Sequence, residues 1–175
     1  MKIDSKPVKK NKYGYIWRMI LIGIIALVLF TFQSAPKPLF RINGVSPNLL
    51  LPFVITVSVF FGEMTGAFFG LFSGLLLDLY VSPCLPFNSI LVMIIGCGCG
   101  LITKHLMTKN FFSVFALSGG IIIFYYTLSW VVYQVIGSTS GRIWYYLNIS
   151  IPSMVYSLIF IIPWFFLTKI ISKNV

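Results

Sequence analysis

Four glycines and one aspartate recur at every fourth residue within a single hydrophobic segment of the chain. The segment reads Gly62-Glu-Met-Thr-Gly66-Ala-Phe-Phe-Gly70-Leu-Phe-Ser-Gly74-Leu-Leu-Leu-Asp78. Residues four apart lie on nearly the same face of a helix, so the pattern predicts a helix with a groove that ends in an acid. Such a groove allows the backbone of another helix to approach closely. Because a carboxylate near membrane depth costs about 2.5–3.5 kcal/mol on insertion scales, we expect the fold to satisfy Asp78.

The stripe of glycines winds around its helix. A period of four residues drifts by about 40° per step on a helix of 3.6 residues per turn. The groove can therefore serve two neighbouring helices, one near Gly62 and Gly66 and another near Gly74 and Asp78. A second patch of small residues follows in the next hydrophobic segment and comprises Gly96, Gly98 and Gly100. We expect these two glycine-bearing helices to lie near the centre of the bundle.

The composition is that of an integral membrane protein. The chain of 175 residues is 58% hydrophobic and only 9% charged, whereas about a quarter of the residues in a globular domain are charged. The formal net charge of +10 would suit nucleic acid. The bases, however, flank hydrophobic segments and form no compact domain, so they are read as topology signals. We expect a lipid bilayer around the chain and no nucleic-acid partner.

Hydrophobic runs predict an all-α, polytopic membrane bundle of six transmembrane helices. We expect a basic cytoplasmic amino-terminal segment at 1–15, a transmembrane domain at 16–171 and a short cytoplasmic tail at 172–175. The predicted spans are, in order, 16–33, 46–61, 63–81, 85–107, 111–136 and 150–171. Only Gly62 separates the second span from the third, which predicts a tight helical hairpin. Pro163 is expected to bend the last span.

The amino-terminal segment admits two interpretations. A basic start followed by an apolar run also resembles a signal peptide, here with cleavage after Ala35. Because Pro36 would follow the cut and the apolar run with its flanks is long enough to span, we expect an uncleaved anchor. With the amino terminus inside, only Lys37, Arg41 and Arg142 of the 13 bases lie outside. The positive-inside rule then places both termini in the cytoplasm and Asp78 toward the outer leaflet.

Catalytic signatures are missing from the sequence. The acids are Asp4, Glu63 and Asp78, too few and too scattered for the paired carboxylates of acid–base catalysis. His105 is expected on the opposite side of the membrane from Asp78, which argues against a Ser/His/Asp arrangement. The cysteines have one histidine nearby, too few donors for a four-ligand metal site. We expect a non-enzymatic protein without a metal or cofactor.

Asp78 itself has a structural and a functional interpretation. As a structural acid it would accept hydrogen bonds from the turn at 82–88, pair with Arg41 or Arg142, or stand protonated. As a functional acid it would relay protons or bind a substrate. We favour the structural interpretation, since a carrier normally has several ionisable groups within the membrane.

Three stretches together resemble the rod shape-determining protein MreD family. They are Ser46-Pro47-Asn48-Leu-Leu-Leu51, the stripe from Gly66 to Asp78 followed by Leu79, and Ser82-Pro83 with Asn88 beyond it. That family has a similar length, a Pro-Asp or Pro-Asn followed by leucines, a glycine-spaced helix that ends in Leu-Leu-Asp, and a short Ser-Pro turn. Asn48 stands where the family often has Asp, and Pro86 stands where it often has Gly.

The resemblance implies a subunit of the cell-wall elongation machinery in the bacterial inner membrane. Its implied partners are the bitopic protein MreC and, more loosely, MreB, RodA and a transpeptidase. It also implies a bundle similar to the substrate-binding subunits of energy-coupling factor transporters, so a small-molecule-binding transport subunit is the alternative function. The first span lacks the Ala-x-x-x-Ala pair with which those subunits dock. The residues expected to shape the bundle or contact partners are Pro47, Asn48, Gly66, Gly70, Gly74, Asp78 and Asn88.

Overall fold

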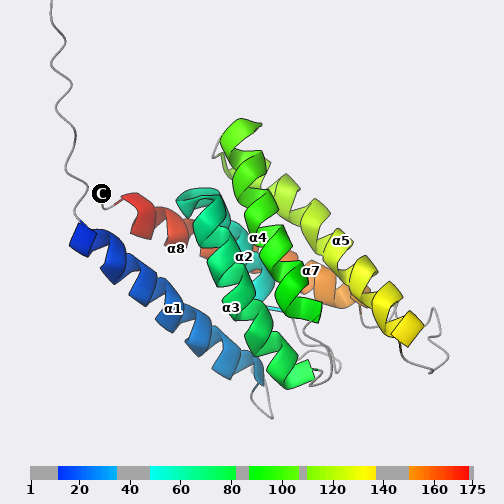
Figure 1. Cartoon of the computed structure of the whole chain (residues 1–175). Helices are drawn as coiled ribbons and strands as arrows, with labels where there is room; N and C mark the ends of the chain where they lie inside the picture. The colour runs from blue at the N-terminus through cyan, green and yellow to red at the C-terminus, as the bar shows by residue number, and fades with distance from the viewer. Residues whose placement is uncertain (1–11, 35–47, 82–86, 107–109, 137–149, 174–175) are drawn as a thin grey trace, which may run out of the picture.

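The computed structural model describes residues 12–34, 48–81, 87–106, 110–136 and 150–173. Every regular element within these ranges is a helix, which confirms the all-α prediction (Figure 1). The helices are α1 (Lys12–Ser34), α2 (Leu50–Phe61), α3 (Glu63–Val81), α4 (Phe87–His105), α5 (Phe111–Ile136), α7 (Ile151–Ile159) and α8 (Ile161–Lys173). In Figure 1, the start of α1 and the end of α8 lie at the same end of the bundle.

The predicted hairpin between the second and third spans is confirmed. Gly62 alone joins α2 to α3 and has a φ of 93°, a left-handed conformation that glycine adopts without steric cost. Its amide donates a hydrogen bond of 2.9 Å to the Ser58 carbonyl, which closes the last turn of α2. A residue with a side chain would be strained at this position.

The last predicted span is interrupted rather than continuous. Helix α7 ends at Ile159 and α8 begins at Ile161. Pro163 lacks an amide hydrogen, and its ring crowds the carbonyl four residues earlier, that of Ile159. The bend expected from Pro163 therefore appears as a break in the helix three residues before the proline.

Four stretches are long and apolar enough to cross a membrane: Ile16–Ser34, Phe87–His105, Phe111–Val132 and Ile151–Ser172. Helix α2 has only 12 residues, a length of about 18 Å, against the roughly 30 Å of a hydrocarbon core. Helix α3 has 19 residues, with three glycines and an aspartate among them. The described part of the chain thus supports four of the six predicted spans by length and composition.

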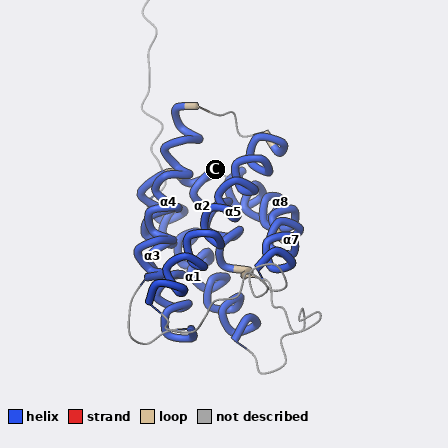
Figure 2. Tube along the Cα trace, turned by 90° about the vertical axis from the view of Figure 1, so that its right-hand side faces the viewer, coloured by secondary structure: helices blue, strands red, loops and turns tan. Residues whose placement is uncertain are grey.

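Helix α2 is the centre of the bundle. Every residue from Leu50 to Val59 is buried, and Figure 2 shows α2 between α3 and α4 on one side and α7 and α8 on the other. Helices α3 and α4, which were expected near the centre, both pack directly against α2. Helix α2 is apolar around its whole circumference and can be buried on every face. Helix α3, in contrast, exposes large apolar side chains such as Met64, Phe68 and Leu79 on its outer face.

Helices α3 and α4 pack with their backbones in contact. A Cβ atom added to Gly66 would lie 2.6 Å from the Gly96 carbonyl oxygen, and one added to Gly70 would lie 2.5 Å from that of Val92. One added to Gly74 would lie 2.6 Å from the carbonyl oxygen of Asn88. Residue numbers that rise along α3 meet numbers that fall along α4, so the two helices are antiparallel.

Two neighbouring helices border the stripe, as its winding allows, but they are not confined to opposite ends of it. Helix α4 lies against Gly66, Gly70 and Gly74 alike, and α2 reaches the stripe where the Ser58 side chain meets Gly66. Ser58 also donates a hydrogen bond to the carbonyl of Gly96 on α4. Two inclined helices touch along an i, i+4 row, so one neighbour can follow a stripe that winds.

Replacing Gly70 by alanine tests this contact. Because the new methyl group would meet the backbone of α4, we expect Gly70→Ala to lower the free energy of unfolding by about 1–3 kcal/mol. The matched control is Gly98→Ala on α4, where nothing lies within 4 Å of an added Cβ. That control should be as stable as wild type, or more stable by up to about 1 kcal/mol from helix propensity. Thermal unfolding of the purified protein in detergent measures both, and equal midpoints for the two variants would contradict the packing.

Candidate functional site

Asp78 binds the first turn of the neighbouring helix α4. The side chain is buried, with 6% of its surface exposed. Its Oδ1 accepts a hydrogen bond of 3.1 Å from the amide of Asn88, and its Oδ2 accepts one of 2.8 Å from the amide of Ser89. The Ser89 hydroxyl donates a further hydrogen bond to Oδ2. Both carboxylate oxygens are therefore engaged.

This arrangement is a helix cap supplied by another helix. The amides in the first turn of a helix have no partner within that helix, and its amino-terminal end carries a partial positive charge. A carboxylate forms strong, charge-assisted hydrogen bonds with such amides. The glycine stripe brings it there, since Gly74, one turn before Asp78, lies against the backbone of Asn88 and Ser89.

The hydrogen bond expected from the turn at 82–88 to Asp78 is present at Asn88, the last residue of that turn. The other candidate partners, Arg41 and Arg142, lie outside the described residues, as do positions 82–86. Ser89 was not anticipated from the sequence, although a serine directly after Asn88 in the first turn of a helix is a plausible donor to an acid.

Asn88 links this cap to a third helix. Its side chain is 3% exposed, and its Oδ1 accepts a hydrogen bond of 2.9 Å from the Tyr125 hydroxyl on α5. The Tyr125 ring is itself buried. Helices α3, α4 and α5 are therefore joined by polar contacts that run from Asp78 through Asn88 to Tyr125.

Asn48 accepts a hydrogen bond from the first turn of α2, as Asp78 does for α4. Its Oδ1 accepts a hydrogen bond of 3.3 Å from the Leu51 amide in the first turn of α2, from a position directly before the N-cap residue Leu49. The amide of Asn48 donates to the Ser157 hydroxyl on α7 at 3.3 Å. That hydroxyl lies 3.4 Å from the Tyr126 hydroxyl on α5. Helices α2, α5 and α7 meet at this point.

We call these residues together the capping layer, because they engage the amides at the amino-terminal ends of α2 and α4 or the side chains that do so. Helix α1 joins it through Gln33, whose Oε1 accepts a hydrogen bond of 3.0 Å from the Leu49 amide. The capping layer comprises Gln33, Asn48, Asp78, Asn88, Ser89, Tyr125, Tyr126 and Ser157.

The residues singled out by sequence fall into two groups. Gly66, Gly70 and Gly74 form the contact between α3 and α4. Asn48, Asp78 and Asn88 belong to the capping layer, and Pro47 lies outside the described residues. Sequence reasoning missed Gln33, Ser89, Tyr125, Tyr126 and Ser157. For Tyr125 and Tyr126 the signal was a pair of adjacent tyrosines within an apolar helix.

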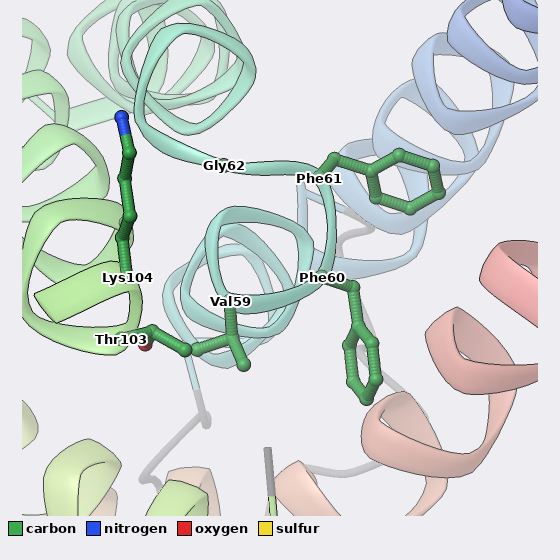
Figure 3. Close-up of a pocket in the computed structure, with 7 residues that line it drawn as sticks. Val59, Phe60, Phe61, Gly62, Thr103 and Lys104 are labelled. Carbon is green, nitrogen blue, oxygen red and sulfur yellow. The ribbon is translucent and has the colours of Figure 1, made fainter. Parts of the chain in front are cut away.

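A pocket of about 230 Å³ lies at the opposite end of α2. It is lined by Val59, Phe60, Phe61, Gly62, Gly100, Thr103 and Lys104. In Figure 3 the rings of Phe60 and Phe61 point away from Lys104. The Lys104 ammonium is 2.9 Å from Glu63 Oε1, so the one charge in the lining is already paired. This ion pair was not anticipated from the sequence.

No protein-family model, curated protein or solved structure matches the chain. Its class therefore rests on the fold, an all-helical bundle with four helices long and apolar enough to cross a membrane. This architecture is compatible with a multi-pass membrane protein.

Replacing Asp78 should weaken the bundle in graded steps. In Asp78→Ala, two buried amides and a hydroxyl lose their acceptor, and each unsatisfied group costs about 1–3 kcal/mol. Asp78→Asn keeps one acceptor oxygen but turns an NH2 group toward donors, so its loss should be intermediate. Glu63→Gln is the control, because that acid belongs to an exposed pair worth about 1 kcal/mol or less. Unfolding midpoints in detergent give the order, and an Asp78→Ala protein as stable as Glu63→Gln would disprove the cap.

The hydrogen bond from Tyr125 can be tested separately. Tyr125→Phe removes only the hydroxyl and should cost about 1 kcal/mol of unfolding free energy, the net worth of a typical hydrogen bond. In an Asn88→Ala background the same change should cost little, because the acceptor is gone. The control is Tyr156→Phe on α7, where no such bond to Asn88 exists. Equal losses in both backgrounds would show that the two side chains are not coupled.

Proposed function

We propose that this chain is a non-enzymatic component of the bacterial cell-wall elongation machinery. In this proposal it maintains rod shape by scaffolding an MreC-like bitopic protein and the enzymes of peptidoglycan synthesis through helix contacts. The association with MreB, RodA and a transpeptidase would be looser.

The observation that carries the proposal is the joint role of the motif residues. Gly70 and Gly74 hold α3 against α4, and Asp78 uses both carboxylate oxygens on the first turn of α4. A proton relay or a substrate ligand needs an acid with an oxygen free for that task. Asp78 instead uses its oxygens to cap α4. A motif that holds two helices rigidly together in this way supports a scaffold.

The proposed location is the cytoplasmic membrane of a bacterium, with several passes and both termini in the cytoplasm. Two observations support it. The start of α1 and the end of α8 lie at one end of the bundle (Figure 1). In the proposed orientation only three of the 13 bases lie outside, as the positive-inside rule requires.

The proposed contact surface is apolar and lies within the membrane. Helix α3 exposes Phe68 and Leu79, and helix α4 exposes Ile90 and Ile94. Side chains of this kind are compatible with lipid and with the transmembrane helix of a partner. Because α3 and α4 are held together by backbone contacts, they would present these side chains in a fixed arrangement.

Depletion of the protein in a rod-shaped bacterium that encodes it tests the proposal. We expect the cells to widen and round, and we expect an affinity-tagged copy to retain an MreC-like protein during purification. The wild-type gene and Gly98→Ala should restore rods. Gly70→Leu should fail, with less protein in the membrane, because its side chain cannot fit against Val92.

Two outcomes would count against the scaffold. Cells that stay rod-shaped after depletion would contradict it directly. A growth defect that an added vitamin cures would instead favour the small-molecule-binding transport subunit. Microscopy of cell width and growth in supplemented medium distinguish these cases.

A further inference from the structure

A cluster of phenylalanines carries a single lysine where α2, α5 and α8 meet. We call it the phenylalanine cluster; its members are Phe60, Phe111, Phe115, Phe165 and Phe166. The centroid of the Phe165 ring is 5.4 Å from that of Phe60 and 5.2 Å from that of Phe111. The ammonium of Lys169 lies 5.5 Å from the Phe165 centroid. The cluster therefore places a cation directly beside aromatic surface.

The phenylalanine cluster has a buried side and an open side. Phe165 is 1% exposed and packs into the bundle, whereas Phe166 is 55% exposed and Phe111 is 41% exposed. The rings of Phe111 and Phe166 are stacked, with centroids 6.3 Å apart. They form an apolar surface on the open side of the cluster. Lys169 is exposed and lies three residues after Phe166, which places the two side chains on the same face of α8.

Lys169 has no carboxylate partner among the residues that the structure describes. The chain contains three acids, Asp4, Glu63 and Asp78. Glu63 is paired with Lys104 at 2.9 Å, and Asp78 caps α4. Neither described acid is available to Lys169, so a compensating anion would come from outside the described part of the chain.

The depth of Lys169 suits a lipid headgroup. It lies three residues before the end of the apolar stretch Ile151–Ser172, about 4–5 Å along a helix. Lysines near the ends of membrane helices extend their ammonium groups toward the headgroup layer. A basic side chain at that level is worth on the order of 1 kcal/mol of attraction to anionic lipid.

We propose that one anionic phospholipid binds here, with its phosphate at the Lys169 ammonium and an acyl chain across Phe111 and Phe166. The ligand has to be an amphiphile, because the cation and the apolar rings lie side by side. An acidic soluble peptide would match the charge but leave the rings uncovered. This site is independent of the proposed scaffold function.

Lipid binding to the full-length protein can be counted by native mass spectrometry. Detergent-solubilised protein is titrated with dioleoylphosphatidylglycerol, which is anionic, and with dioleoylphosphatidylcholine, which is zwitterionic. We expect Lys169→Gln to weaken binding of the first phosphatidylglycerol about five-fold, the worth of one basic residue near an anionic surface. Binding of phosphatidylcholine should not change.

The matched control is Lys104→Gln, which removes the same charge from a lysine already paired with Glu63. It should leave the first phosphatidylglycerol bound as in wild type. Phe166→Ala should weaken binding of both lipids, since it removes apolar surface from the acyl-chain contact. Equal phosphatidylglycerol binding by wild type and Lys169→Gln would overturn the proposal. Equal losses of phosphatidylglycerol binding in Lys169→Gln and Lys104→Gln would also overturn it, because they would show that the lipid responds only to the net charge of the protein.

Discussion

The close contact between the backbones of α3 and α4 governs the arrangement of the rest of the molecule. Without side chains at Gly66, Gly70 and Gly74, the two helices approach within van der Waals distance along several turns. Dispersion contacts of this kind replace the hydrophobic effect, which gives little drive for association between helices in lipid. The contact also fixes the register of α3 against α4, and so it places Asp78 at the amides of Asn88 and Ser89.

The capping layer supplies hydrogen-bond acceptors to backbone amides that the packing of the helices buries. When helices start inside a bundle, their first amides are cut off from water, and an unsatisfied polar group there costs several kcal/mol. Asn48, directly before α2, accepts a hydrogen bond from an amide of α2. Asp78, on the neighbouring helix α3, accepts hydrogen bonds from amides of α4. Because those acceptors are linked to Tyr125, Tyr126 and Ser157, the same hydrogen bonds join the outer helices to the core. A polar residue in this layer is therefore explained by the fold before any chemistry is invoked, which supports the proposed scaffold over a carrier.

The acids and the bases of the chain are placed differently. The described acids are used inside the protein, one on a helix terminus and one in a pair with Lys104. The bases greatly outnumber them, with 13 lysines and arginines against three acids. An excess of this kind is balanced by the surroundings, and an anionic membrane surface is the nearest source of negative charge. Lys169, beside exposed aromatic rings, is the described base best placed to hold a single lipid.

The sequence alone determined the helical class, the hairpin at Gly62, a bend near Pro163 and the need for a partner at Asp78. Each follows from local chemistry: hydrophobic length, a backbone angle that glycine permits, a missing amide, and the cost of a buried charge. Only the tertiary structure decided that α2 is central, that α4 lies against Gly66, Gly70 and Gly74 alike, and that Asn48 contacts Ser157, which is 109 residues away in the sequence. Helical periodicity shows which residues share a face, but it does not say which helix that face will meet, because the choice depends on the packing of all the helices at once.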